Sequence, residues 1–271
     1  MKMPGNDNLI CVQSLKKQFG ELVAVDGISF DVKQGDVFAF LGPNGAGKTT
    51  TIRMLITLLK PTSGTATVDG LDVVKNSAEV RRKIGYVPQL ISVDGTLTAF
   101  ENLVLMAKLY DIPWRECASR AREILSFLAL EDHEDALVRT FSGGMIRRLE
   151  IGQAIVHRPN ALFLDEPTSG LDPVARQNVW EHILDLQKLY GTTIFFSTHQ
   201  MEEADAMSDK IAIMNRGTIS VIGTSSEIKS MTGTPDATLE DAFIHLTGMN
   251  LEERGNFRDT RRSRQVERRL G

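Results

Sequence analysis

The stretch GPNGAGKTT, Gly42 to Thr50, constrains the fold of this chain more than any other segment. It matches the pattern G-x-x-x-x-G-K-[ST], follows the apolar run VFAFL and opens KTTTIRMLITLL, whose apolar residues recur at helical spacing. Glycines let backbone N–H groups wrap around a polyphosphate, and the lysine ammonium reaches its terminal phosphates. The segment therefore predicts a strand, a phosphate-binding loop (P-loop) and a helix, which is the unit of a parallel α/β fold.

Every residue of this loop is a candidate nucleotide-binding residue. The loop comprises Gly42, Pro43, Asn44, Gly45, Ala46, Gly47, Lys48, Thr49 and Thr50. The Thr49 hydroxyl is also a candidate ligand of Mg²⁺, because this cation prefers oxygen ligands. A glycine-rich turn without function is the alternative, and the flanking strand and helix argue against it.

A second apolar run, ALFLDE, predicts a buried strand that ends in two carboxylates, Asp165 and Glu166. Neighbouring residues of a strand point to opposite faces, but at the strand's end the chain can turn both toward a nucleotide. Asp165 is then a candidate Mg²⁺ ligand, directly or through water. Glu166 is the candidate base that positions the attacking water. A surface Asp-Glu turn fits less well after four apolar residues.

A third apolar run, TTIFFSTH, ends at His199. A lone histidine is more often structural or solvent-facing. Ligands of α/β sheets bind at the carboxyl ends of the strands, however, so we expect His199 to donate to a terminal phosphate oxygen and to hold Glu166 in place.

Ser142, Gly143 and Gly144 stand directly before an amphipathic run that extends to Val156. Glycines at a helix start expose backbone N–H groups at the positive end of the helix dipole, where an anion can bind. A flexible hinge is the competing interpretation.

Composition limits the function classes open to these 271 residues. The net charge of −4 and the pI of about 5.8 argue against a basic nucleic-acid-binding body. No apolar run approaches the roughly 18 residues that cross a bilayer. Two distant cysteines, without metal-like spacing, fit a reducing compartment, so we expect a cytoplasmic protein.

The order of patterns predicts an α/β fold with a mixed sheet core, an antiparallel β subdomain and an inserted α-helical subdomain at about 98–160. Residues 209–215 and 218–223 are expected to form a hairpin around Arg216 and Gly217. A C-terminal helical extension is expected at 226–250, followed by a basic, flexible tail at 251–271 that contains seven arginines and four acidic residues.

Six segments together resemble the nucleotide-binding subunits of ATP-binding cassette (ABC) transporters. GPNGAGKTT is similar to Walker A, LFLDE to Walker B, YVPQ with Gln89 to the Q-loop, FSGGM to the signature motif, SGLD with Asp172 to the D-loop and STH with His199 to the switch histidine. Their order and spacing agree over residues 8–225, so the resemblance implies a P-loop NTPase of the ABC ATPase type over this range.

The resemblance also implies a head-to-tail dimer, most simply of two copies of this chain, that binds ATP and Mg²⁺. Ser142, Gly143 and Gly144 of one subunit would cap the γ-phosphate held by the other, and Asp172 would lie beside that site. Gln89 would contact Mg²⁺ and transmit the closure of the dimer to a membrane partner. Phe19 stands where an adenine-stacking tyrosine is common, although a strand-end core residue is the alternative. Met145 replaces the usual glutamine.

The segments FSGGMIRRLEIGQAIV, LFLDEPTSGLDP and STHQMEEAD, followed by TLEDAFIHLTG, resemble the branch that pairs with ABC-2-type permeases. That branch includes daunorubicin-resistance-like drug exporters and some lipid and polysaccharide exporters. The resemblance therefore implies an export ATPase, peripheral on the inner face of the cell membrane through its permease. A soluble ABC-type ATPase without a permease and a P-loop kinase are the alternatives. The tail is either a solvated arm or a weak contact to anionic lipid. Arg147 and Arg148 are predicted on the exposed or subunit-facing side of their helix.

Overall fold

Short, completely buried strands with apolar centres form the middle of the fold. β3 (Val37–Leu41), β7 (Ala161–Asp165) and β8 (Thr193–Thr198) are buried along their whole lengths. Strands covered on both faces of a sheet consist of continuous apolar runs rather than alternating ones. The computed structural model describes residues 7–248, and in it these three strands lie side by side and parallel.

A six-stranded mixed sheet extends from this centre in the order β10-β9-β3-β8-β7-β6. Its outer strands are β6 (Ile84–Val87), β9 (Lys210–Asn215) and β10 (Thr218–Gly223). β10 pairs antiparallel with β9, whereas the other neighbours are parallel. The turn between β9 and β10 has positive φ angles at Arg216 (46°) and Gly217 (81°), which a tight two-residue hairpin turn requires. The predicted hairpin is confirmed.

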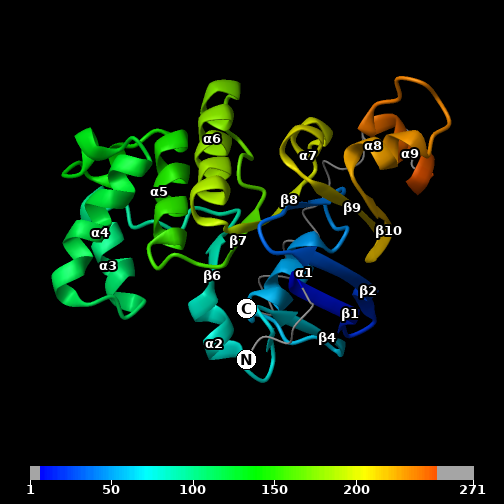
Figure 1. The fold of residues 1–271 in the computed structure, drawn as a ribbon, viewed down its shortest axis with the longest axis horizontal. Helices are drawn as coiled ribbons and strands as arrows, with labels where there is room; N and C mark the ends of the chain where they lie inside the picture. Colours follow the sequence, from blue (N-terminus) through cyan, green and yellow to red (C-terminus); the bar gives the residue numbers. More distant parts are fainter. Residues whose placement is uncertain (1–6, 249–271) are drawn as a thin grey trace.

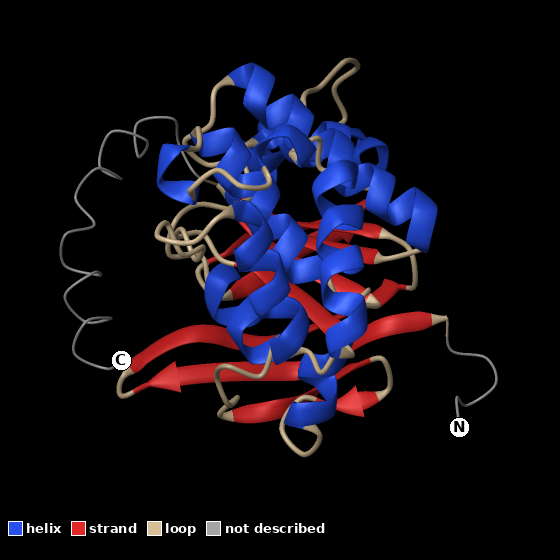
Figure 2. Cartoon of the chain, turned by 90° about the vertical axis from the view of Figure 1, so that its left-hand side faces the viewer, coloured by secondary structure: helices blue, strands red, loops and turns tan. Residues whose placement is uncertain are grey.

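A separate antiparallel sheet lies along one side of the molecule, with strand order β2-β1-β4-β5. Its strands are β1 (Asn8–Phe19), β2 (Leu22–Lys33), β4 (Ser63–Val68) and β5 (Leu71–Asp72). Figure 2 shows its long strands on one side of the molecule and most of the helices on the other. The helix α1 (Lys48–Leu55), which follows the phosphate loop, packs against β2, β4 and β7.

Helices occupy both ends of the molecule (Figure 1). One end holds α3 (Ala99–Leu109), α4 (Trp114–Phe127) and α5 (Gly143–Ile155), with the short 3₁₀ turns η1 (Glu131–His133) and η2 (Val138–Thr140). The other end holds α8 (Ser225–Ser230) and α9 (Leu239–Thr247), and α6 (Pro173–Tyr190) lies between the two ends. The predicted fold class, a mixed sheet with an antiparallel β part and a helical part, is confirmed.

The central sheet separates two hydrophobic cores, because successive side chains of a strand point to opposite faces. Phe38 and Phe40 face the antiparallel sheet and pack with Phe195, whose ring centroid lies 5.5 Å from that of Phe38. Ala39 and Leu41, the alternate residues of the same strand, belong to the core formed with the helical end. Both faces of β3 are therefore fixed, and so is the direction in which the loop after it leaves the sheet.

Some elements differ from the sequence prediction. The helical pattern after the phosphate loop continues to Leu59, but α1 ends at Leu55 because Thr57 has a left-handed φ of 70°. The Leu59 N–H then bonds to the carbonyl of Arg53 as the chain leaves the helix. Sequence patterns did not predict four short elements: the strands β5 and β6 and the helices α2 (Ser77–Lys83) and α7 (Met201–Met207).

No helix within residues 7–248 is both long enough and apolar enough to cross a membrane. The expected extension at 226–250 contains most of α8 and all of α9 in its described part. The basic tail at 251–271 and its expected lipid contact lie outside the described residues.

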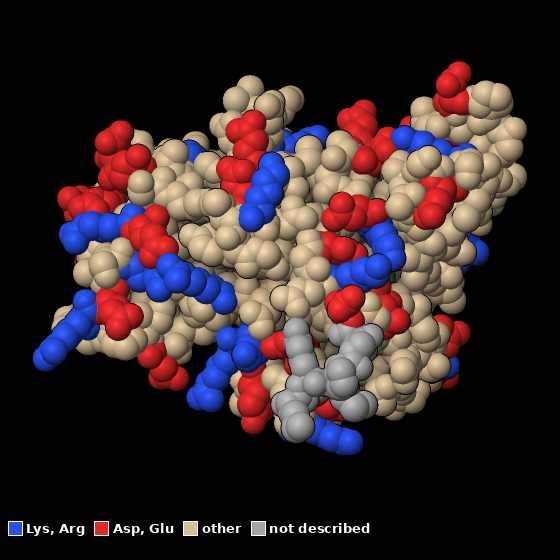
Figure 3. All heavy atoms as spheres, in the orientation of Figure 1, with Lys and Arg blue, Asp and Glu red and all other residues tan. Residues whose placement is uncertain are grey.

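Acidic and basic side chains are interspersed over the face of the molecule that Figure 3 shows. The fields of neighbouring opposite charges offset one another, and salt screens each charge beyond the Debye length, which is about 8 Å at physiological ionic strength. That face of the described chain therefore carries no extended field of one sign.

His157 is a half-buried titratable group just beyond the end of α5. Its ring stacks on Tyr110 with 3.7 Å between the centroids, and its Nε2 lies 3.0 Å from the carbonyl oxygen of Ile84. A carbonyl only accepts, so Nε2 carries the proton, and the buried Nδ1 has no hydrogen-bond partner among the described residues. Burial lowers the pKa of His157 to about 4, although the hydrogen bond to the Ile84 carbonyl acts in the opposite direction.

The burial of His157 predicts a pH-dependent stability. The pKa of histidine in the unfolded chain is about 6.5. The neutral ring therefore contributes fully to the free energy of unfolding above pH 6.5, and this contribution is lost as the pH falls from 6.5 to about 4. His157→Gln keeps an N–H for Ile84 and does not titrate. Between pH 6.5 and 4, the free energy of unfolding measured in urea is expected to fall less in the variant than in the wild type, by up to about 3 kcal/mol. Parallel curves for the two proteins would contradict this.

Candidate nucleotide-binding site

The phosphate loop passes so close to neighbouring backbone that two of its glycines have no substitute. A Cβ on Gly42 would lie 2.2 Å from the carbonyl oxygen of Met214 on β9. At Gly47, where φ is +106°, a Cβ would lie 2.5 Å from the carbonyl oxygen of Ala24 on β2. Both sheets thus press on the loop, which fixes its path between β3 and α1.

Lys48 is the first residue of α1 and is almost fully buried. Its ammonium donates to the carbonyl oxygens of Gly42 (2.7 Å) and Pro43 (3.1 Å), and lies 3.8 Å from the Glu166 carboxylate. Burial lowers the pKa of Lys48, although the charges of Glu166 and Asp165 act in the opposite direction. The ammonium is therefore held at the mouth of the loop by oxygens that phosphate oxygens can replace.

Asp165 is the last residue of β7 and contacts the end of β8 and the start of α1. Its Oδ1 accepts from the Ser197 hydroxyl at 2.6 Å and from the Thr49 hydroxyl at 3.0 Å. Burial raises the pKa of Asp165, and these two hydrogen bonds oppose the rise. The arrangement places a carboxylate and a hydroxyl from the phosphate loop side by side, as the sequence predicts for the carboxyl ends of parallel strands.

Glu166 adopts a left-handed backbone conformation, with φ of 50°. Such angles are uncommon for residues other than glycine and concentrate at functional sites. Two contacts stabilise the conformation, because the Glu166 N–H donates to both the carbonyl oxygen and the hydroxyl of Ser197, each at 3.1 Å. The turn brings the Glu166 side chain to the same side of the sheet as Asp165, which a regular strand would prevent.

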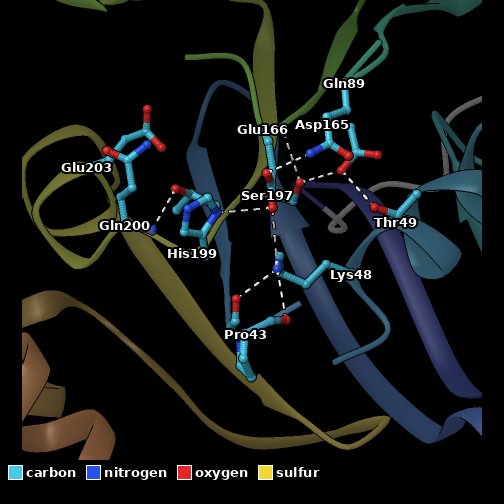
Figure 4. Close-up of polar contacts among 12 residues, drawn as sticks. Pro43, Lys48, Thr49, Gln89, Asp165, Glu166, Ser197, His199, Gln200 and Glu203 are labelled. Atoms are coloured by element: carbon cyan, nitrogen blue, oxygen red, sulfur yellow. Dashed lines mark hydrogen bonds and ion pairs between the residues drawn. The ribbon is translucent and has the colours of Figure 1, made fainter. Parts of the chain in front are cut away.

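Three side chains from three segments hold the Glu166 carboxylate (Figure 4). The Gln89 amide donates to Oε2 at 2.9 Å, while Nδ1 of His199 lies 3.2 Å from Oε1 and the Lys48 ammonium 3.8 Å from it. Burial acts to raise the pKa of Glu166, but the hydrogen bond and charge of His199 and the charge of Lys48 outweigh it, so the pKa lies below its ordinary value. Glu166 is therefore ionised at neutral pH, as a base must be.

Other predicted residues lie apart from this cluster. Within residues 7–248, no hydrogen bond or ion pair links Phe19, Asp172 or the segment 142–144 to Lys48 or Glu166. Phe19 ends β1 with its ring partly exposed and the Lys17 ammonium 4.9 Å from the ring centroid. It is not a core residue.

Ser142 and Asp172 are helix caps. The Ser142 hydroxyl accepts from the Met145 N–H at 3.3 Å at the start of α5, and Asp172 accepts from Val174 and Ala175 at the start of α6. Ser142 and Gly143 are exposed. The N-terminus of α5 is thus accessible, and the serine hydroxyl retains its proton for an external acceptor.

The sequence analysis missed two groups of polar residues near the site. Ser197 binds both Asp165 and Glu166, and its position at the end of the same strand as His199 was the available signal. Glu203, on α7, accepts from the Trp180 indole at 2.8 Å and from the Thr168 hydroxyl, so it ties α7 to α6 and to the turn after Glu166. Nothing in the local sequence indicates that partnership.

The prediction for Arg147 was wrong. Instead of lying on an exposed or subunit-facing side, Arg147 is buried, and its guanidinium donates to the carbonyl oxygen of Pro88 at 2.7 Å. Arg148 is half-buried and donates to the carbonyl oxygen of Leu128 at 2.7 Å. Amphipathic spacing identifies the helix but does not reveal that a distant loop covers its polar side.

A phosphate loop between β3 and α1, with carboxylates at the end of a neighbouring parallel strand, defines a P-loop nucleotide hydrolase. The family model described as "ABC transporter" matches residues 25–169, more than half of the chain. The chain belongs to the ABC transporter family, and it is an ATPase of that family.

Curated relatives share much of the sequence. The daunorubicin/doxorubicin resistance ATP-binding protein DrrA of Streptomyces peucetius is 47% identical over 219 residues, which cover 81% of this chain and 66% of the relative. The linearmycin resistance ATP-binding protein LnrL of Bacillus subtilis (strain 168) is 40% identical over 90% of this chain and 76% of the relative. The predicted resemblance to daunorubicin-resistance-like proteins is confirmed.

Solved structures share the fold. An ATP-binding subunit of an ABC transporter superposes with a TM-score of 0.79 at 29% identity, covering 88% of this chain and 99% of that chain. A dimeric ATP-binding cassette in a post-hydrolysis state, bound to ADP and Pi, gives 0.71 at 26% identity, covering 79% and 98%. The ABC ATPase fold predicted from the six motifs is confirmed.

The close backbone approach at Gly47 predicts unequal costs for two alanine substitutions. Gly45 also has a positive φ, +79°, but a Cβ there meets no atom within 4 Å. Gly45→Ala is expected to destabilise by about 1–2 kcal/mol from backbone strain alone. Gly47→Ala adds a clash with the Ala24 carbonyl and is expected to cost roughly 1–3 kcal/mol more. Thermal or urea unfolding measures both, and equal costs would contradict the packing described for the loop.

Proposed function

We propose that this chain is the ATP-hydrolysing subunit of an export system, in which dimer closure powers a separate membrane permease. The Glu166 carboxylate carries the proposal, because Gln89, His199 and Lys48 hold it together beside the phosphate loop. The printed names of the two resistance proteins support export as the direction of transport. We assign the ATPase domain to residues 8–225, with its helical subdomain at about 98–160.

ATP is the substrate, and the phosphate loop of residues 42–50 binds its phosphates. The Lys48 ammonium exchanges the carbonyl oxygens of Gly42 and Pro43 for phosphate oxygens. The exposed ring of Phe19 offers the adenine a stacking surface at the end of β1, since stacking requires only an aromatic face.

The residues around Asp165 fit a bound Mg²⁺. The Thr49 hydroxyl and an Asp165 carboxylate oxygen lie 3.0 Å apart, and both are the hard oxygen ligands that this cation prefers. The Gln89 amide oxygen is the third candidate ligand. Mg²⁺ bound there neutralises charge on the phosphates. Ser197 holds the Asp165 carboxylate in position through its hydroxyl.

Glu166 acts as the base that orients the attacking water and accepts its proton. Its lowered pKa keeps the carboxylate ionised, and its left-handed backbone directs it toward the phosphates. His199, whose ring reaches Glu166 Oε1, holds the carboxylate on one side and donates to a terminal phosphate oxygen. Hydrolysis then depends on orientation and charge, as phosphoryl transfer generally does.

One chain supplies only part of the site in this proposal. The N-terminus of α5, with Ser142, Gly143 and Gly144, is exposed and unconnected to Lys48 of the same chain. A second subunit placed head to tail presents these N–H groups and the Ser142 hydroxyl to the γ-phosphate, with Asp172 beside them. The dimeric ADP- and Pi-bound cassette supports such a pairing.

Closure of the dimer by ATP and its separation after hydrolysis provide two states that the γ-phosphate biases. A permease of the ABC-2 type converts this change into export of a drug-like, lipid or polysaccharide substrate. The chain is then peripheral on the inner face of the cell membrane, attached through the permease.

Glu166→Gln is the variant that tests the proposal. Glutamine keeps the size of the side chain but cannot accept the proton, so ATP binding is expected to persist while turnover falls at least about 100-fold. The nucleotide-bound dimer then accumulates, which size-exclusion chromatography with ATP measures. In detergent extracts of the native membrane, the trapped dimer is expected to retain a permease. Phosphate release at the wild-type rate would refute the catalytic assignment, and a dimer without any membrane protein would refute the transport assignment.

A further inference from the structure

One face of α5 carries a stripe of buried polar residues that the reaction described above does not use. Arg147, Glu150 and Gln153 recur every third residue and are 6%, 2% and 9% exposed. Residues at this spacing lie on the same side of a helix. A row of polar side chains on the buried side of a helix requires partners. The segment from Pro88 to Asp94 supplies those of Arg147 and Glu150, and Asn102 on α3 supplies that of Gln153.

Arg147 binds this segment at its start. The guanidinium donates to the carbonyl oxygen of Pro88 at 2.7 Å and to that of Gln89 at 3.2 Å. The two nitrogens of one rigid planar fork thus hold two successive carbonyl groups. The same guanidinium lies 2.9 Å from the Glu150 carboxylate, one turn further along α5.

Glu150 binds the segment three residues later. Its Oε1 accepts from the Ser92 N–H at 2.6 Å and from the Ser92 hydroxyl at 2.9 Å. Gln153 continues the stripe by donating to Asn102 on α3, whose side chain accepts from the Asp94 N–H at 3.1 Å. The segment is therefore bound to α5 directly at Pro88, Gln89 and Ser92, and indirectly at Asp94 through Asn102.

Stability alone does not explain the buried ion pair between Arg147 and Glu150. Removing two charges from water costs several kcal/mol per ion, and well-packed apolar residues often give equal or greater stability. What an ion pair with directed hydrogen bonds adds is a specific geometry. Here that geometry concerns Gln89, whose backbone carbonyl Arg147 holds and whose side-chain amide reaches Glu166.

We propose that Arg147 and Glu150 are positioning residues that lock the Gln89 segment to α5. They orient the Gln89 amide toward Glu166 at one nucleotide, and they make the segment and the α5 N-terminus move as one unit. Because Arg147 is only three residues from Gly144, a shift of Gln89 at one ATP displaces the cap that the same chain offers to the other ATP. The inference rests on the proposed function, in which the two sites belong to a dimer.

The test compares two neighbouring arginines of the same helix. Arg147→Met removes the guanidinium that holds Gln89 but retains much of the apolar stem. Arg148→Met is the matched control, because within residues 7–248 Arg148 donates only to the carbonyls of Leu128 and Ala129, away from the Gln89 segment. Each variant is combined with Gln89→Ala, and kcat and KM for ATP are measured for the full chain.

Arg147→Met is expected to lower kcat about tenfold with little change in KM, since a misplaced Gln89 affects the reaction and not ATP binding. Adding Gln89→Ala is expected to lower kcat no further than Gln89→Ala alone, because both changes remove one interaction. Arg148→Met is expected to keep kcat within about twofold of wild type and to remain additive with Gln89→Ala. Multiplied effects of Arg147→Met and Gln89→Ala would overturn the proposal.

A second variant distinguishes a loss of Gln89 positioning from a general folding defect. Arg147→Met leaves the Glu150 charge buried without its partner, whereas Arg147→Met combined with Glu150→Gln retains an acceptor for Ser92 and buries no net charge. This double variant is expected to unfold near the wild-type midpoint and still to show the reduced kcat. Restored kcat in the double variant would assign the loss to folding and overturn the proposal. If Gln89→Ala alone has wild-type activity, the proposed role of Gln89 fails instead.

Discussion

Three segments that are distant in the sequence hold the carboxylate of Glu166. Lys48 comes from the phosphate loop, Gln89 from the segment after β6 and His199 from the end of β8. The contact is possible because the carboxyl ends of the parallel strands meet at one edge of the sheet, and because Glu166 turns into a left-handed conformation there. If this junction were absent, the phosphate loop would lack the carboxylate that we propose as the base, and the contacts that position it.

The rest of the architecture fixes the position of this junction. The two hydrophobic cores clamp β3 from both faces, and the two sheets press on the loop at Gly42 and Gly47. Ser197 orients both carboxylates from the neighbouring strand. Lys48, Asp165 and Glu166 all bond to other parts of the site, and Gln89 connects the site to α5.

Local patterns predicted the parts of the site that are contiguous in the sequence. The phosphate loop, Asp165, Glu166 and His199 each follow an apolar strand, and short-range spacing is enough to identify them. Gln89 was identified only by resemblance to a family, because nothing around YVPQ specifies a partner 77 residues away. Arg147 was misplaced for the same reason. Its partners are the carbonyls of Pro88 and Gln89, and a helical periodicity cannot show which loop covers a helix face.

The proposed function requires a second subunit to complete each ATP site. ATPase activity per chain, measured as the protein is diluted, tests this most directly when sedimentation is recorded under the same conditions. We predict that activity per chain falls in step with the fraction of dimer. We also predict that Gly144→Asp, which places a negative charge at the α5 N-terminus, is inactive at every concentration. Constant activity per chain in a sample that sediments as a monomer with ATP would contradict the claim.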